Sequence, residues 1–373
     1  MLLCTTAAAG GSTVDPALGV ASQRAVPTPI FAYYTIDHTS QGWSQSRGDL
    51  PLLGRYASDE HDVILSHITS AKAAGIAGFL VRWKSNRTLD ARLTQLVDLA
   101  AQNDFKLGIA YDASKVDGSR VHPRRVRRDL DRFIDGFASS TAFDSFARPL
   151  VIWSGTENYS RSQVARTTRE RRDSLLILAS ESTVAGVTRL GRTVAGNAHE
   201  WSSLDPQRKR GFALKFAAMG DAVRANGGIW IPGVSPGFEA VRPDGGSDVT
   251  PRRAGETLML RLSGAQRSDP DVIGLASWND FARGTYVEPS QLFGQQYLEL
   301  LASTRGSEAS LSAAANGGTE ETRAGTRLNG TVLLGAVLLV GVFVLLAAAR
   351  RGWRERSGPR PVEADYVTTV RSL

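Results

Sequence analysis

Eight short apolar runs alternate with longer stretches of helical periodicity along most of the chain. The runs lie at 30–36, 78–83, 106–111, 149–154, 175–180, 193–198, 228–234 and 272–277. Each is short enough to be a buried strand. Helices are predicted between them at 58–74, 88–103, 122–137, 161–172, 206–226 and 251–267, with a last helix at 291–303 and no clear helix between the fifth and sixth runs. Strands and helices that alternate in this number predict an α/β fold of the (β/α)8, or TIM, barrel type.

A doubly wound parallel sheet is the alternative architecture for such an alternation. It usually carries a Gly-rich phosphate-binding turn after its first strand. This chain has Tyr34-Thr-Ile-Asp-His-Thr39 at that place instead. The absence of glycines there favours the barrel.

The composition changes on both sides of the predicted barrel at 28–303. Residues 1–27 are small and polar, which is typical of a disordered N-terminus or the remnant of a signal segment. Residues 304–328 are rich in Ala, Gly, Ser, Thr and Glu and predict a flexible linker.

Residues 329–349 predict a single transmembrane helix. The stretch 331–349 contains no charged residue and is long enough to cross a bilayer, whereas a buried core helix would not be expected after a linker. Arginines crowd the tail at 350–373, so the positive-inside rule places that tail in the cytoplasm. The sequence therefore predicts a single-pass protein of the cell membrane with an extracytoplasmic barrel.

The net charge of +7 does not indicate a nucleic-acid partner. Much of the excess lies in the C-terminal tail, and the basic clusters at 124–128 and 208–210 fall on predicted amphipathic helices, where a solvated helix face explains them. No zinc-finger, RRM or helix-turn-helix pattern accompanies them. Cys4 is the only cysteine, and His38 and His199 do not stand at metal-ligand spacing, so we expect neither a metal site nor a cofactor.

Aromatic and polar residues gather where the predicted strands end. In a barrel, functional groups collect at the C-terminal ends of the strands. Aromatic rings can pack on the C–H face of a sugar, while carboxylates and amides hydrogen-bond its hydroxyls, although packing at the barrel end would explain each tryptophan singly. The predicted ligand-contacting residues are Tyr33, Tyr34, Trp83, Tyr111, Asp112, Ser235, Trp278 and Asn279. These residue types predict a glycan ligand.

The segment Ser277-Trp-Asn-Asp-Phe-Ala-Arg-Gly-Thr-Tyr-Val-Glu-Pro289 resembles the Ser-Phe-Asn-Glu-Trp-His-Glu-Gly-Thr-Gln-Ile-Glu-Pro signature of glycoside hydrolase family 99. That family contains endo-α-1,2-mannosidases and endomannanases. Further agreement with the family lies at 33–43, 54–64, 74–79 and 231–237. The resemblance covers about residues 30–303 and leaves out the linker and the predicted membrane helix.

The resemblance implies a (β/α)8 barrel and an endo-acting, retaining reaction on α-linked mannose-type glycans. In the family, the first glutamate of the signature is a base on the sugar's 2-hydroxyl, and the second protonates the leaving oxygen. These two positions are Asp280 and Arg283 in this chain. Asp112 matches a glutamate near the bound sugar, and Glu288 matches a residue that looks structural.

Arg283 departs from the family pattern because a guanidinium does not act as an acid at physiological pH. Two hypotheses follow: a membrane-anchored hydrolase that takes its acid from elsewhere, or a carbohydrate-binding pseudoenzyme on the same barrel. Glu157, Glu200 and Asp37 are the strand-end candidates for a replacement acid. A third hypothesis is that Arg283 recognises a glycan carrying a carboxylate or phosphate.

Overall fold

The computed structural model describes residues 27–45, 48–113, 119–199, 211–241 and 247–304. Several predicted segments lie outside the described residues. They are the N-terminal segment 1–27 except residue 27, the linker 304–328 except residue 304, the membrane helix 329–349 and the tail 350–373. Within the described residues, no helix is long and apolar enough to cross a membrane.

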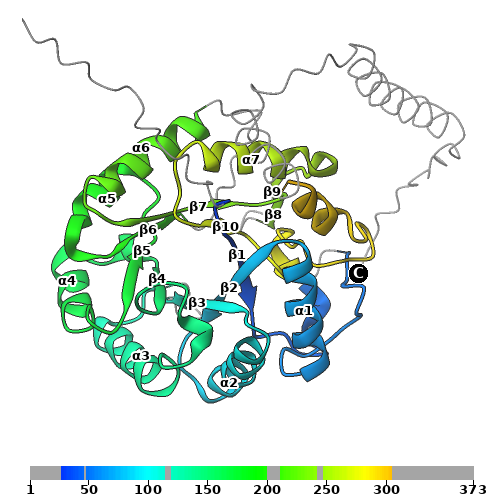
Figure 1. Ribbon diagram of the computed structural model, residues 1–373, viewed down its shortest axis with the longest axis horizontal. Helices are drawn as coiled ribbons and strands as arrows, with labels where there is room; N and C mark the ends of the chain where they lie inside the picture. Colours follow the sequence, from blue (N-terminus) through cyan, green and yellow to red (C-terminus); the bar gives the residue numbers. More distant parts are fainter. Residues whose placement is uncertain (1–26, 46–47, 114–118, 200–210, 242–246, 305–373) are drawn as a thin grey trace, which may run out of the picture. The chain divides into compact units, whose positions relative to one another are not determined.

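Eight parallel strands close into a barrel, and the described helices surround it (Figure 1). The barrel strands are β1 (Ile30–Thr35), β2 (Ile76–Trp83), β3 (Lys106–Asp112), β4 (Leu150–Ser154), β5 (Leu176–Ala179), β6 (Gly196–His199), β7 (Ile229–Val234) and β10 (Ile273–Leu275). Each strand pairs with its neighbour in the chain order, and β10 closes the ring on β1 with Ile30 opposite Ile273. The predicted barrel and all eight predicted strands are confirmed.

The helices fall close to their predicted positions, with one addition. They are α1 (His61–Ala73), α2 (Arg87–Gln102), α3 (Pro123–Gly136), α4 (Arg161–Arg169), α5 (Val184–Leu190), α6 (Phe212–Arg224), α7 (Glu256–Gln266) and a last helix at 296–304. The short α5 occupies the interval between the fifth and sixth strands, where no helix was predicted. Capping hydrogen bonds set the first residue of several helices. At the start of α2, Asn86 accepts a hydrogen bond from Leu89 N at 3.0 Å, and at the start of α4, Ser160 forms a capping box with Gln163.

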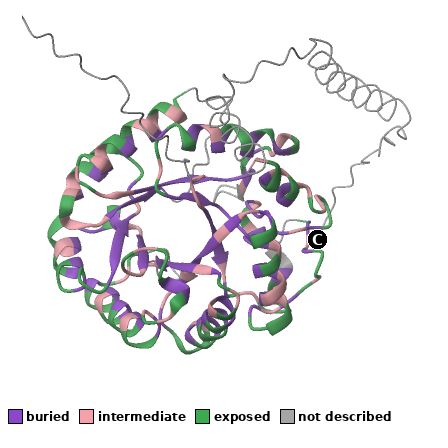
Figure 2. Ribbon diagram, viewed as in Figure 1, coloured by how far each residue is buried: buried purple, intermediate pink, exposed green. Residues whose placement is uncertain are grey.

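Two apolar layers hold the barrel together, one inside the ring and one between the ring and its helices. Alternate strand residues such as Phe31, Leu80 and Ile152 fill the interior. Their neighbours in sequence, such as Val81 and Val151, pack outward against the helices. This alternation follows from the two-residue period of a strand. The strands are therefore buried on both faces, and the outer helix faces are exposed (Figure 2).

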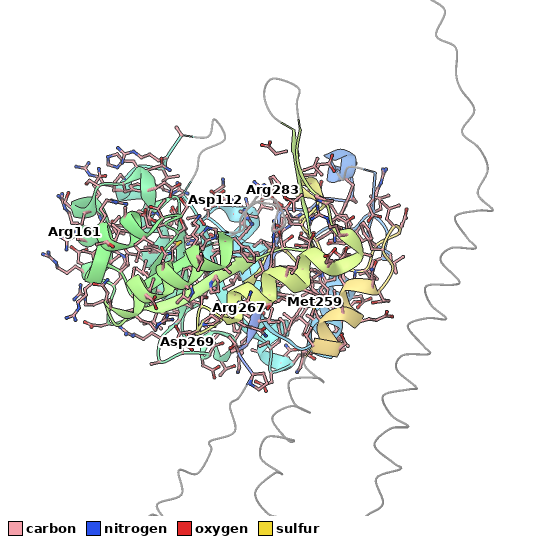
Figure 3. The ribbon with its side chains drawn as sticks, turned by 90° about the horizontal axis from the view of Figure 1, so that it is seen from above. Asp112, Arg161, Met259, Arg267, Asp269 and Arg283 are labelled. Atoms are coloured by element: carbon pink, nitrogen blue, oxygen red, sulfur yellow. The ribbon has the colours of Figure 1, made fainter. Side chains whose placement is uncertain are left out.

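An antiparallel hairpin interrupts the strand–helix alternation after β7. It consists of β8 (Phe238–Val241) and β9 (Ser247–Thr250), with Phe238 opposite Thr250. Figure 3 shows these two strands projecting beyond the barrel edge that carries Asp112 and Arg283. The sequence analysis assigned no element to this segment.

Candidate functional site

A polar cleft of about 600 Å³ opens at the C-terminal edge of the barrel. Residues that follow β10, β1, β2 and β3 line it, and these four strands are consecutive neighbours in the ring. The hairpin strand β8 adds a further wall. The charged lining residues are Asp37, Arg82, Lys84, Asp112, Glu239, Asp280 and Arg283. The volume is in the range of small-molecule sites.

Asp280 lies in this cleft at the end of the loop that follows β10. Its side chain is only 9% exposed, whereas that of Arg283 is 47% exposed. Arg283 Nη1 donates to Asp280 Oδ2 at 2.7 Å, and the Arg283 backbone N–H donates to Oδ1 at 3.1 Å. Both carboxylate oxygens therefore accept a hydrogen bond from the same residue, which fixes the carboxylate in one orientation.

The loop around Asp280 folds back on itself and is anchored to β1. Ser277 N donates to Thr285 O at 2.8 Å, and Trp278 N donates to Tyr33 O, also at 2.8 Å. The Ser277 hydroxyl accepts a hydrogen bond from Asp280 N at 2.9 Å, and the Ala276–Ser277 peptide is cis. These hydrogen bonds fix the backbone that carries Asp280 to the end of β1.

Asn279 fastens this loop to the end of β1. Its Oδ1 accepts from Thr35 N at 2.8 Å, and its Nδ2 donates to Thr35 O at 3.0 Å. His38 Nε2 lies 3.0 Å from Asn279 O, and a carbonyl can only accept, so Nε2 carries the proton. Burial lowers the pKa of His38, against a smaller opposing effect of the Asp37 charge. His38 therefore faces the cleft as a neutral ring stacked on Trp43 at 4.5 Å.

A buried polar network lies behind the cleft and contains Glu288. Tyr56 OH donates to Glu288 Oε2 at 2.8 Å, and His67 Nε2 lies 3.0 Å from Oε1. His67 Nδ1 is 2.9 Å from Tyr34 OH. Burial, and then the charge of Glu288, raise the pKa of Tyr34 and of Tyr56, so both phenols stay protonated donors. Glu288 does not line the cleft, in agreement with the structural position that the family signature implies.

Four of the ten predicted site residues line the cleft, namely Trp83, Asp112, Asp280 and Arg283. Asp112 Oδ2 accepts from Lys84 Nζ at 3.2 Å, and both side chains are partly exposed. Trp83 borders the cleft but is 1% exposed, with its indole N–H donated to Asp90 at 3.0 Å.

The other six predicted site residues lie outside the cleft. Tyr33 points into the barrel interior, whereas Tyr34, Tyr111 and Trp278 pack outward among the helices. Asn279 and Ser235 are buried; Asn279 bonds the β1 backbone, and Ser235 Oγ accepts from Arg261.

The structure buries the two tryptophans that the sequence predicts as ligand contacts. Trp83 and Trp278 pack between the strands and the helices, as do Trp153 and Trp230. Side chains at successive strand positions point to opposite faces, and the sequence did not fix which face each tryptophan takes.

Glu239 and Lys84 are cleft residues that the sequence analysis missed. Lys84 follows the predicted end of the second strand by one residue. Glu239 lies on the unpredicted hairpin, for which a signal exists: two short segments, 238–241 and 247–250, flank Pro243-Asp-Gly-Gly246 in the sequence. Of the three candidates for a replacement acid, only Asp37 lines the cleft; Glu157 is exposed elsewhere, and Glu200 is outside the described residues.

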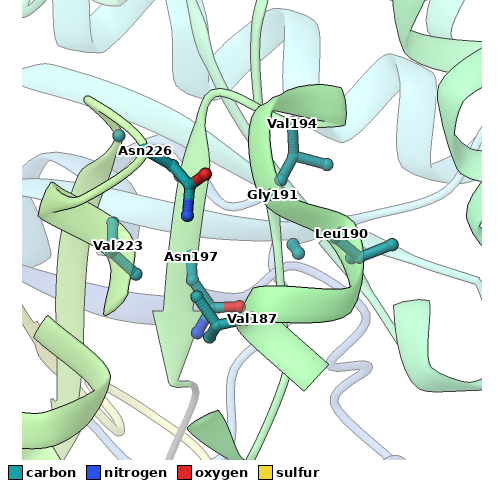
Figure 4. Close-up of a pocket in the computed structure, with 10 residues that line it drawn as sticks. Val187, Leu190, Gly191, Val194, Asn197, Val223 and Asn226 are labelled. Atoms are coloured by element: carbon teal, nitrogen blue, oxygen red, sulfur yellow. The ribbon is translucent and has the colours of Figure 1, made fainter. Parts of the chain in front are cut away.

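A second pocket lies between α5, α6 and the barrel, and its lining includes Val187, Leu190 and Val223 (Figure 4). Its volume of about 10 Å³ is enough for one water molecule, so it is a packing gap rather than a ligand site. In the part of the chain that the structure describes, no group of three His, Cys, Asp or Glu side chains could hold a metal ion.

No protein-family model matches the chain. Among curated proteins, the mouse glycoprotein endo-alpha-1,2-mannosidase is 21% identical over 277 residues, covering 64% of this chain and 56% of the relative. The human glycoprotein endo-alpha-1,2-mannosidase-like protein is 22% identical over 285 residues, covering 67% of this chain and 60% of the relative. The chain therefore spans less than two thirds of the length of these relatives.

Solved structures show the same barrel. The GH99 endo-alpha-mannosidase from Bacteroides thetaiotaomicron superposes with a TM-score of 0.65 at 17% identity, covering 78% of this chain and 99% of that structure. The chain is similar to glycoside hydrolase family 99 in sequence and in fold. A further structure described as a glycoside hydrolase-like protein has a TM-score of 0.55 at 18% identity.

Proposed function

We propose that this family-99-like barrel is an endo-acting glycoside hydrolase that cleaves α-linked mannose-type glycans. The reaction would retain the configuration of the anomeric carbon. The observation that carries the proposal is Asp280, a nearly buried carboxylate in a polar cleft of about 600 Å³ at the C-terminal edge of the barrel. That edge is where barrel enzymes place their catalytic groups. The likeness to endo-α-mannosidases supplies the substrate class.

In this proposal Asp280 takes the proton of the 2-hydroxyl of the sugar, and the resulting oxygen attacks the anomeric carbon. Arg283 orients Asp280 through its two hydrogen bonds of 2.7 Å and 3.1 Å. Correct orientation of a reacting group accounts for a large share of enzymatic rate enhancement. Arg283 itself cannot protonate the leaving oxygen, so a second carboxyl group is required.

A second candidate function is glycan binding without cleavage. The observation that favours it is the same ion pair, because Arg283 already donates a hydrogen bond to each of the two Asp280 oxygens. An arginine and a carboxylate at a cleft can bind sugar hydroxyls with good geometry. The two functions make opposite predictions about product formation.

The deciding experiment incubates the full-length protein with α-1,2- and α-1,6-linked manno-oligosaccharides and follows the products by mass spectrometry. Hydrolysis predicts fragments that disappear in Asp280→Asn and persist in Glu157→Gln, a matched change at an exposed carboxylate outside the cleft. Saturable binding of a glycan that stays intact would support the second candidate function, glycan binding without cleavage. Absence of both binding and cleavage would refute the carbohydrate proposal.

A further inference from the structure

The β8–β9 hairpin brings an additional carboxylate to the cleft. Glu239 lies on β8 and lines the cleft together with Asp280 and Arg283. The hairpin stands at the cleft edge of the barrel (Figure 3). It follows β7, whereas Asp280 and Arg283 follow β10, the neighbouring strand of the ring.

The backbone of β8 packs directly on the residue after Arg283. A methyl group added at Gly284 would lie 3.5 Å from Glu239 Cβ and 3.7 Å from Glu239 N. Gly284 has φ 59°, in the left-handed region that favours glycine. This close approach places Glu239 beside the position where the family signature has its second glutamate.

Arg252 fixes the foot of the hairpin to the loop that carries Asp280. Its Nη2 donates to Gly284 O at 3.1 Å and to Tyr286 O at 2.9 Å. Its guanidinium also lies over the rings of Tyr286, Phe293 and Tyr297, at 4.3, 4.6 and 4.7 Å from their centroids. These contacts tie β9 to the signature loop, so the hairpin holds a defined position relative to Asp280.

The remaining cleft carboxylates come from other strands of the ring, because Asp112 ends β3 and Asp37 follows β1. Glu239 alone, among the described carboxylates that line the cleft, comes from a segment packed on Gly284.

We propose that Glu239 is the general acid that replaces the family's second glutamate; this inference rests on the hydrolase function proposed above. As the 2-oxygen, deprotonated by Asp280, bonds to C1, the C1–oxygen bond to the leaving sugar breaks. That leaving oxygen takes the carboxyl proton of Glu239. Water then opens the 1,2-anhydro sugar at C1 and gives its proton to Glu239, while the 2-oxygen recovers its proton from Asp280. Both carboxyl groups return to their starting protonation states.

The test compares Glu239→Gln with wild-type protein on two substrates: an α-linked mannan oligosaccharide, and the α-fluoride of the same donor sugar. Fluoride leaves without protonation, so in the first step, where the C1–leaving-group bond breaks, the loss of an acid slows only the glycan. In single-turnover measurements of this step we expect a fall of about 100-fold or more on the glycan, the usual contribution of general acid catalysis, and little change on the fluoride. Glu299→Gln, at an exposed position of the last helix outside the cleft, should leave both rates unchanged, and Glu239→Asp should recover part of the glycan rate.

The outcomes separate this inference from the function on which it rests. An active wild-type protein whose Glu239→Gln variant is unchanged in the first step, or is slowed equally on both substrates in that step, would overturn the role of Glu239 alone. A glycan rate in Glu239→Asp as low as that in Glu239→Gln would also overturn it. Wild-type protein that turns over neither substrate would overturn the hydrolase function and this assignment together.

Discussion

Glu288 stabilises the fold through two buried hydrogen bonds. Its side chain is 1% exposed and accepts two hydrogen bonds, one from Tyr56 OH and one from His67 Nε2. Glu288→Ala would leave two buried donors without this partner, so we expect a loss of about 2–4 kcal/mol in the free energy of unfolding. Urea denaturation would measure it, with the exposed Glu157→Ala as the control. A loss no greater than in the control would contradict the structural role.

His199 makes stability depend on pH. Burial, and then the charge of Lys215, lower the pKa of His199 to about 4 from an ordinary value of 6.5. The unfolded chain therefore binds this proton at a higher pH than the folded protein does. The stabilisation is complete above about pH 6.5 and is lost as the pH falls toward 4.

The expected loss from His199 at pH 5 is about 2 kcal/mol relative to pH 7.5. Urea unfolding of wild-type protein and of His199→Gln at both pH values would measure how much His199 contributes to the decline in the free energy of unfolding. The variant should show a smaller decline, and part of the decline should remain because burial also lowers the pKa of His38. The exposed His61→Gln serves as the control. An equal decline in His199→Gln and wild-type protein would refute the prediction.

The β8–β9 hairpin depends on Arg252 for its attachment to the barrel. Lysine keeps the charge but cannot reproduce the planar stacking and the two hydrogen bonds to Gly284 and Tyr286. Arg252→Lys should therefore speed amide hydrogen exchange in β8 and β9 at least several-fold, while exchange in β1 to β6 stays unchanged. Arg267→Lys is the matched control, because Arg267 is exposed and directly follows the last residue of α7. Unchanged exchange in the hairpin would show that other contacts hold it.

The barrel strands could be predicted because each is a short apolar run buried on both faces. The two missed elements lack such a signal. Helix α5 has only seven residues, fewer than periodicity can establish, and the two hairpin strands have only four residues each, Phe-Glu-Ala-Val and Ser-Asp-Val-Thr, which form no apolar run. Sequence reasoning therefore recovers the core elements better than the elements that shape the site.

The candidate site was predictable in part, because strand-end positions identify Trp83 and Asp112 and the signature identifies Asp280 and Arg283. Asp280 and Arg283 follow from the signature, and the structure brings them within 2.7 Å of each other. Trp278 belongs to the same motif, yet it packs between the strands and the helices. Its ring centroid lies 5.5 Å from that of Phe79 and 5.5 Å from that of His67. Glu239 lies 41 positions before Asp280 in the sequence, so its place in the same cleft depends on the pairing of β7 with β10 rather than on any local pattern.

Attachment to a membrane concerns the whole molecule, because the uncharged run 331–349 follows the barrel in the sequence. We therefore propose that residues 329–349 anchor the protein, on the basis of the uncharged run 331–349 and the arginines that follow it.

The anchor proposal predicts how two forms of the protein partition. Full-length protein should sediment with membranes, resist extraction by high salt and by alkaline carbonate, and be released by detergent, because a spanning helix is held by the hydrocarbon core. A chain ended at residue 304 should stay in the supernatant. Protease added outside intact cells should remove the barrel and leave an epitope tag at residue 373 protected. Full-length protein released by salt or carbonate would overturn the anchor, and a tag cleaved from outside would reverse its orientation.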